Sequence, residues 1–285
     1  MTDQRGNQTA TEKVEPTARS MRTVAMTALG GTSIEWYDFF IYGTAAALVF
    51  PTLFFAEDMP RYVSLIASFS TFAVGFLARP VGGVVFGHFG DRVGRKAALV
   101  TALMMMGVAT TLIGLLPSYE QVGPLAPLLL IFLRFVQGLA VGGQWGGAML
   151  LVTENAPSDQ RGFYGAFAQV GAPAGLVLAN LAFLAVSGNL SDEAFMDWGW
   201  RVPFISSVLL IGLSLYVQLK LEDTEAFKEL AQAAIPAETK PRSPVLQALK
   251  TYPREIGLAA GSFLGVQVTF YTVSYTHLRA HETTN

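Results

Sequence analysis

Seven long apolar runs, separated by short polar connections, dominate the pattern along the chain. The runs cover approximately residues 24–55, 62–89, 97–116, 127–152, 163–186, 202–219 and 256–275. An α-helix rises 1.5 Å per residue, so about 20 apolar residues span a hydrocarbon core of about 30 Å. Backbone polar groups must be bonded internally in lipid, and a helix achieves this within one segment. The pattern therefore predicts an all-α, polytopic membrane protein.

The same pattern divides the chain into five segments. We predict a flexible N-terminus (1–20), a six-helix transmembrane bundle (21–219), a central loop (220–255), a seventh transmembrane helix (256–275) and a tail (276–285). The tail turns abruptly polar, and we interpret it as non-native sequence on a chain shortened at its C-terminus. A native tail, or a metal-binding tail that uses His277 and His281, are the alternatives.

The distribution of basic residues predicts how the chain crosses the membrane. With the N-terminus inside, 14 Lys and Arg residues lie in inner segments, and only Arg61 and Arg201 lie in outer loops. Inner loops of membrane proteins carry this excess, so we predict a cytoplasmic N-terminus and central loop. Charged residues make up 14% of the chain and the net charge is −2, which gives no basic field for nucleic acid. Cysteine is absent, which excludes disulfides and thiol chemistry.

Four ionisable residues lie inside the predicted spans: Glu35 and Asp38 in the first, Arg79 in the second and Arg134 in the fourth. A charge at bilayer depth costs about 2.5–3.5 kcal/mol on insertion scales, so each is a functional candidate. At 1.5 Å per residue, Glu35, Asp38 and Arg134 lie roughly 20–24 Å above the inner surface, and Arg79 lies roughly 15 Å above it. We therefore expect Arg134 to meet the two carboxylates, which share one helix face.

These four residues are candidates for proton coupling or substrate binding. An arginine favours the ionised form of a carboxylate beside it, so a change in that contact would couple proton binding to conformation. The alternative is a static ion pair that fixes helix packing. Gln137 and Gln144 lie near the face of Arg134 and could hydrogen-bond either a substrate or a neighbouring helix.

Glycines recur at four-residue spacing in the fourth and fifth spans. Gly138, Gly142 and Gly146 form such a series in the fourth span, and Gly171 and Gly175 form a pair in the fifth. Small residues at this spacing allow helix backbones to approach closely. We predict that they are mainly packing contacts.

The connection after the second span reads Gly87-His88-Phe89-Gly90-Asp91-Arg92-Val93-Gly94-Arg95-Lys96. Its glycines allow a tight turn and close helix contact. The aspartate could act as a breakable latch on a helix N-terminus or an arginine, and the basic residues would anchor the inner face. We predict a cytoplasmic gating motif that consists of Gly87, Asp91, Arg92, Gly94, Arg95 and Lys96.

This spacing resembles the signature that the major facilitator superfamily carries between its second and third helices. Other stretches are similar to the metabolite:proton symporter family of that superfamily. They are Gly31–Gly43 with Glu35 and Asp38, Arg79-Pro80-Val81-Gly82-Gly83, Arg134–Gly138, Gly142–Gly147 and Trp200–Phe204. Together the motifs follow the family's order over about residues 20–275.

The resemblance implies the N-terminal six-helix half of a major facilitator fold, with about one further helix. It also implies a proton-coupled symporter of the bacterial inner membrane that imports a small metabolite by alternating access. Family substrates include shikimate, 2-oxoglutarate, citrate, proline and betaine. The expected partners are this small molecule, protons and the lipid bilayer, and no cofactor beyond the coupling proton is expected.

Other functions are open at this stage. An efflux antiporter would be expected to carry a longer Gly-Pro-Gly-Gly pattern than Gly171–Gly175 provides, and a facilitator would need no proton. A shortened chain could also be an inactive half-transporter. The sequence contains no nucleophile–base set, phosphate loop or metal-ligand spacing, so we do not expect an enzyme.

The sequence departs from the family pattern in two respects. Family members usually carry Glu where this chain has Gln144, which weakens any charge-based role there. The family has twelve helices, whereas seven are predicted here. If Asp91 latches onto the second half, as the resemblance implies, its partner is not in this sequence.

Overall fold

The computed structural model describes residues 18–93, 95–157 and 159–220, and in addition 250–262, 264–265 and 268–269. Within the first three ranges the elements follow in this order: α1 (Ala18–Leu48), α2 (Phe50–Leu53), α3 (Arg61–Val93), α4 (Arg95–Gly114), α5 (Tyr119–Val122), α6 (Leu125–Asn155), α7 (Arg161–Ser187), α8 (Asp192–Ala194), the π-helical turn η1 (Phe195–Gly199) and α9 (Arg201–Lys220). These elements belong to one compact unit, Met1–Ala233.

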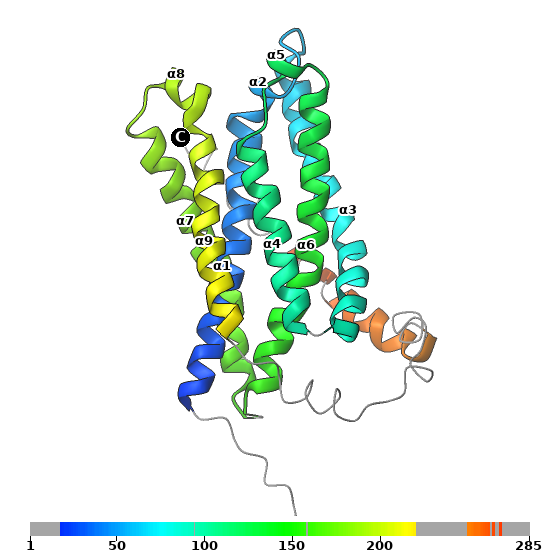
Figure 1. Cartoon of the computed structure of the whole chain (residues 1–285). Coiled ribbons are helices and arrows are strands. Elements are labelled where there is room, and N and C mark those ends of the chain that lie inside the picture. Colours follow the sequence, from blue (N-terminus) through cyan, green and yellow to red (C-terminus); the bar gives the residue numbers. More distant parts are fainter. Residues whose placement is uncertain are drawn as a thin grey trace, which may run out of the picture. The chain divides into compact units, whose positions relative to one another are not determined.

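The six long helices α1, α3, α4, α6, α7 and α9 coincide with the first six predicted runs, which confirms the fold class. They stand side by side, and the short elements α2, α5 and α8 gather at one end of the unit (Figure 1). The sequence pattern did not predict these short elements or the turn η1. They are only three to five residues long, too short for a helical period to appear.

A second compact unit, Ala234–Asn285, contains the remaining described residues. Residues 253–262 are helical, and they include the start of the seventh predicted run. The predicted tail (276–285), most of the predicted central loop and residues 1–17 lie outside the described residues.

The outer surface of the first unit is apolar, as a lipid-facing surface requires. Large side chains stand exposed on it, among them Leu77 (75% exposed) and Leu209 (77% exposed). Among the described residues, the stretches Arg61–Gly90, Leu125–Gly143 and Arg161–Ser187 are long and apolar enough to cross a membrane by themselves. Helix α1 is as long as α6 but is not among these stretches, and its buried polar residues include Glu35 and Asp38.

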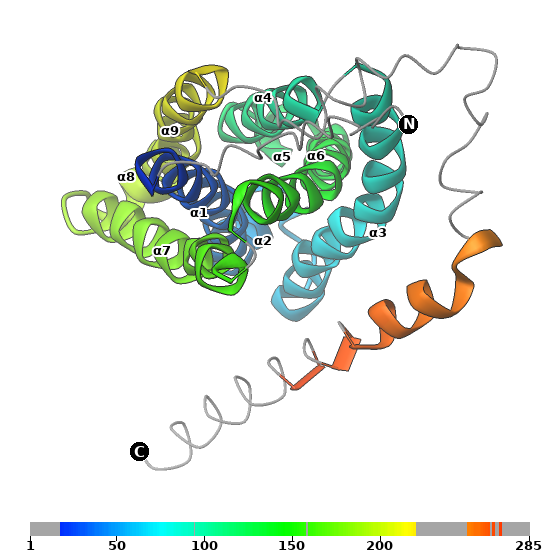
Figure 2. The ribbon, with the colours of Figure 1, turned by 90° about the horizontal axis from the view of Figure 1, so that it is seen from below.

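Close backbone contact joins α3 to α6 and α1 to α7, the two most extensive helix pairs. Viewed along the helices, α1 lies between α7 and α6, and α3 lies on the far side of α6 (Figure 2). A Cβ atom added at Gly142 of α6 would overlap the Arg79 carbonyl group of α3, and one added at Gly171 of α7 would overlap Thr32 of α1. The glycines of α6 and α7 therefore act as packing contacts, because a larger residue would separate the helices.

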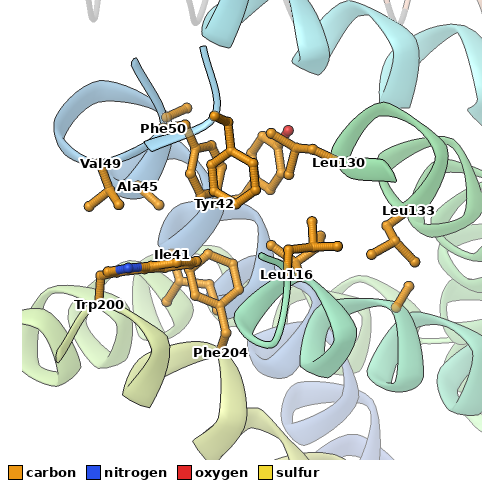
Figure 3. Close-up of a cluster of buried hydrophobic side chains, with 14 of the residues drawn as sticks. Ile41, Tyr42, Ala45, Val49, Phe50, Leu116, Leu130, Leu133, Trp200 and Phe204 are labelled. Atoms are coloured by element: carbon orange, nitrogen blue, oxygen red, sulfur yellow. The ribbon is translucent and has the colours of Figure 1, made fainter. Parts of the chain in front are cut away.

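An aromatic cluster fills the bundle toward the end that carries α2 (Figure 3). The Phe50 ring lies between that of Tyr42 of α1 and that of Trp200, which directly follows η1, with ring centroids 5.2 and 6.1 Å away. The Trp200 ring also lies 5.9 Å from that of Phe204 of α9. These rings pack edge to face, the arrangement that aromatic quadrupoles favour. The cluster includes Tyr37, Ile41 and Tyr42 of α1, so it lies next to the polar residues of that helix.

Arg201 anchors the start of α9 to the end of α4. Its guanidinium donates hydrogen bonds to the Gly114 and Leu116 carbonyl oxygens, at 2.9 and 2.8 Å, and lies over the Trp200 ring. The last carbonyls of a helix have no partner within the helix and carry partial negative charge. Arg201, counted in the sequence only as an outer-loop charge, thus caps α4.

Candidate functional site

Asp38 lies at the centre of a buried hydrogen-bond network that joins α1, α4 and α6. The Thr110 hydroxyl of α4 donates to Asp38 Oδ1, and Gln137 Nε2 of α6 donates to Asp38 Oδ2 at 3.0 Å. Gln137 Nε2 also lies 2.8 Å from Thr110 Oγ1, and the Thr110 hydroxyl lies 2.9 Å from the Met106 carbonyl oxygen. Asp38 is only 4% exposed, so uncharged donors replace the water that its carboxylate would otherwise bind.

Arg134 reaches this network through Gln137 rather than through a direct bond to the carboxylate. Its terminal nitrogen donates to Gln137 Oε1 at 3.1 Å, and the charge of Arg134 acts on Asp38 from there. The structure thus brings Arg134 and Asp38 together, with the glutamine between them. A buried positive charge and a buried negative charge stabilise one another in such a low-dielectric setting.

Aromatic rings and a glycine hold the Arg134 side chain in place. The guanidinium carbon lies 4.0 Å from the centroid of the Tyr42 ring and 4.8 Å from that of Phe72, a cation–π arrangement. A Cβ atom added at Gly75 would meet Arg134 Nε at 2.9 Å, so the glycine leaves room for the side chain. The Tyr42 hydroxyl in turn hydrogen-bonds Thr71. Arg134 Nε is buried and has no hydrogen-bond partner.

Glu35 lies one turn from Asp38 but in different surroundings. It is 7% exposed, and its Oε2 atom is buried without a hydrogen-bond partner. The positive charge that acts on Glu35 is that of Arg79 of α3. The Arg79 guanidinium lies over Phe76 and Phe39, 4.5 and 5.9 Å from the ring centroids. Glu35 and Arg79 therefore form a second, less satisfied pair of charges beside the Asp38 network.

Thr110 is the network residue that sequence reasoning missed. A threonine in an apolar helix usually bonds a carbonyl of its own helix, as Thr111 does with Gly107, and such residues carry no distinctive signal. Thr110 differs because α4 turns it toward α1, which only the rotation of the packed helix reveals. Gly75 and Phe72 were missed for the same reason, since their roles depend on the Arg134 side chain.

For several residues of the predicted sites, the structure describes the backbone but not the side chain, or neither. The side chains of Gln144, Asp91, Arg95 and Lys96 lie outside the described residues, and so does Gly94 as a whole. Gly87 and Arg92 are exposed residues of the last turns of α3. The predicted gating motif therefore spans the end of α3 and the start of α4. Within the described residues, no three His, Cys, Asp or Glu side chains gather as a metal site would require.

Comparisons with known proteins agree with this arrangement of helices. Residues 23–249 match the family described as sugar (and other) transporter. The chain is 54% identical to the inner membrane metabolite transport protein YhjE of Escherichia coli (strain K12) over 214 aligned residues. The alignment covers 75% of this chain and 48% of the relative. The chain is 46% identical over 232 residues to the shikimate transporter of the same strain (81% and 52%), and 34% identical over 256 residues to the proline/betaine transporter (88% and 51%).

Among solved structures, the xylose transporter XylE of E. coli in a partially occluded inward-open conformation has the same fold. The TM-score is 0.65 at 18% identity, over 74% of this chain and 50% of that one. The chain thus spans about half the length of the curated relatives it matches. The predicted transporter family is confirmed: the chain belongs to the sugar (and other) transporter family, and its fold is that of a solved proton:xylose symporter of the major facilitator superfamily.

Proposed function

We propose that the chain is the N-terminal part of a proton-coupled symporter that imports a small metabolite across the bacterial inner membrane. The observation that carries this proposal is the buried network of Asp38, Thr110, Gln137 and Arg134. Ionisable groups inside a membrane protein are costly and are kept mainly for ion or substrate pathways. The relatives named as metabolite, shikimate and proline/betaine transporters support the same class.

The network suits coupling because it bonds three helices through one carboxylate. A change in the proton content of the α1 carboxylates changes the charge that is buried between these helices, and so alters how they pack. In this mechanism, two halves of the complete transporter rock around a midplane site, and protonation biases the equilibrium between the outward-open and inward-open states.

The substrate in this proposal carries a carboxylate, either as an organic acid or as a zwitterion. Arg79 and Arg134 supply the two positive charges beside the network, and a guanidinium binds a carboxylate through paired donors. Gln137 and Gln144 are candidates for further hydrogen bonds to it. The names of the relatives include both classes, the shikimate transporter and the proline/betaine transporter.

The proposed orientation places the N-terminus in the cytoplasm, on the basis of the Lys and Arg distribution. The motif of Gly87, Asp91, Arg92, Gly94, Arg95 and Lys96 then lies at the inner face between α3 and α4. We assign it a gating role, in which Asp91 forms a contact that breaks when the inner side opens. The function is transport rather than catalysis, and the proton is the only coupling ion.

The test is uptake by the complete gene product in proteoliposomes. Labelled shikimate, proline and glycine betaine are offered separately, with and without an inward proton gradient. A symporter accumulates one of these above its external concentration only with the gradient, and a protonophore abolishes the accumulation. Equilibration that ignores the gradient would indicate a facilitator, and expulsion driven by the gradient would indicate an antiporter. Either result would overturn the proposal.

A further inference from the structure

The two carboxyl groups of α1 differ in how their oxygens are bonded. Both oxygens of Asp38 accept hydrogen bonds, one from Thr110 and one from Gln137. Oxygen Oε2 of Glu35 is equally buried and accepts none. An ionised carboxylate is an acceptor only, whereas a protonated one also donates. The surroundings therefore suit different protonation states at the two positions.

Protonation of Asp38 would disturb the network around it. A proton on Oδ2 would face the amide nitrogen of Gln137, which can only donate, so that bond would be lost. A proton on Oδ1 would require Thr110 to accept instead of donate. Hydrogen bonds to a charged group are stronger than those to a neutral one, so the network favours the ionised form of Asp38.

Protonation of Glu35 at Oε2 breaks no hydrogen bond, because that atom has none. A buried charged oxygen without a donor is among the most costly groups in a protein interior, and a proton removes that charge. The side chain is as enclosed as that of Asp38, so bulk water does not compensate for the missing donor. Glu35 thus gains most from taking up a proton.

The charged and titratable groups around Glu35 come from three helices. Asp38 lies one turn away on α1, Arg79 faces it from α3, and Arg134 of α6 lies beyond Asp38. Helix α7 meets this part of α1 through Gly171 and Gly175, which bring no charge. On the side toward α9, the Tyr37 hydroxyl bonds the Pro203 carbonyl oxygen. Arg79 is therefore the cation that opposes protonation of Glu35.

We propose that Glu35 takes up and releases the coupling proton, whereas Asp38 stays ionised and positions α1 against α4 and α6. This assignment rests on the proposed proton-coupled function. A substrate carboxylate that binds Arg79 compensates its charge, so the arginine opposes protonation of Glu35 less. Proton binding and anion binding then favour one another, which is the coupling that a symporter needs. The proton enters from the outer side onto Glu35 Oε2 and leaves to the inner side.

The test that does not depend on transport is infrared spectroscopy of the protein in lipid nanodiscs. The pH is lowered from about 8 to about 5.5, a range in which exposed carboxyl groups with an ordinary pKa near 4 stay ionised. We expect the C=O stretch of a protonated carboxylic acid, shifted in D2O, to appear in the protein and in Asp38→Asn, and to be absent in Glu35→Gln. Glu57→Gln, at an exposed position, serves as the matched control and keeps the band.

The infrared result tests the assignment of the proton to Glu35, and the transport assay tests the proposed function, so the two can fail separately. The absence of the band in the unsubstituted protein, or its presence in Glu35→Gln, overturns the assignment whatever the transport assay shows. If Asp38→Asn fails to fold, judged by circular dichroism, Thr110→Val replaces it, and the band should persist there too. In proteoliposomes, Glu35→Gln should abolish accumulation driven by the proton gradient while substrate exchange continues. Loss of gradient dependence through Asp38→Asn alone would contradict the assignment.

Discussion

Replacing Thr110 with valine tests whether the Asp38 network holds the bundle together. Valine keeps the branched shape of threonine but lacks the hydroxyl, so the substitution removes the donor to Asp38 and leaves the packing of α4 nearly unchanged. Thr111→Val is the matched control. Its hydroxyl bonds only the Gly107 carbonyl oxygen of the same helix, at 2.8 Å.

The magnitude follows from the charge on Asp38. A hydrogen bond to a charged group contributes about 1.5–3 kcal/mol, whereas side-chain hydrogen bonds measured within bilayers average about 0.6 kcal/mol and reach about 1.7 kcal/mol. Because Asp38 is enclosed and charged, we expect Thr110→Val to lower the free energy of unfolding by about 1.5 kcal/mol. Thr111→Val, which removes a bond to a backbone carbonyl within one helix, should stay within about 0.5 kcal/mol.

Equilibrium unfolding in mixed detergent micelles, followed by circular dichroism, measures this difference. The unfolding equilibrium constant of Thr110→Val should increase about tenfold relative to that of Thr111→Val, since about 1.4 kcal/mol corresponds to a factor of ten. If the two valine variants unfold at the same detergent fraction, the bond between Thr110 and Asp38 does not stabilise the bundle. The reasoning that treats Asp38 as a fixed, ionised acceptor would then be wrong.

Two further predictions concern helix packing and capping. Gly82→Ala should destabilise the bundle by about 1–3 kcal/mol, because its Cβ atom overlaps the backbone of α6, whereas Gly212→Ala in open space should stabilise it by about 0.5–1 kcal/mol. Unfolding midpoints that shift in the same direction would contradict this. Arg201→Gln removes the donors to the end of α4, so amide hydrogen exchange there should quicken several-fold, and equal protection in Arg201→Gln and the exposed Arg61→Gln would refute the capping role.

The sequence alone determined the helices and the family. Lipid forces each long apolar run to satisfy its own backbone, so run length and charge content were enough to locate α1, α3, α4, α6, α7 and α9. The ionisable residues inside these runs were equally visible, since a charge is rare at that depth. The motif spacing then indicated a transporter family, and the comparisons confirm the family and the fold.

Only the tertiary structure decided how the candidate residues are bonded. Glu35 and Asp38 are three residues apart on one helix, yet Asp38 is fully bonded and Glu35 has an unpartnered oxygen. Arg134 is linked to Asp38 through Gln137. Thr110 of α4 also belongs to the network, although the sequence of α4 contains no pattern that indicates this role. These partners depend on the rotation and depth of each packed helix, which the close contacts at glycines set and which the order of residues along one chain does not express.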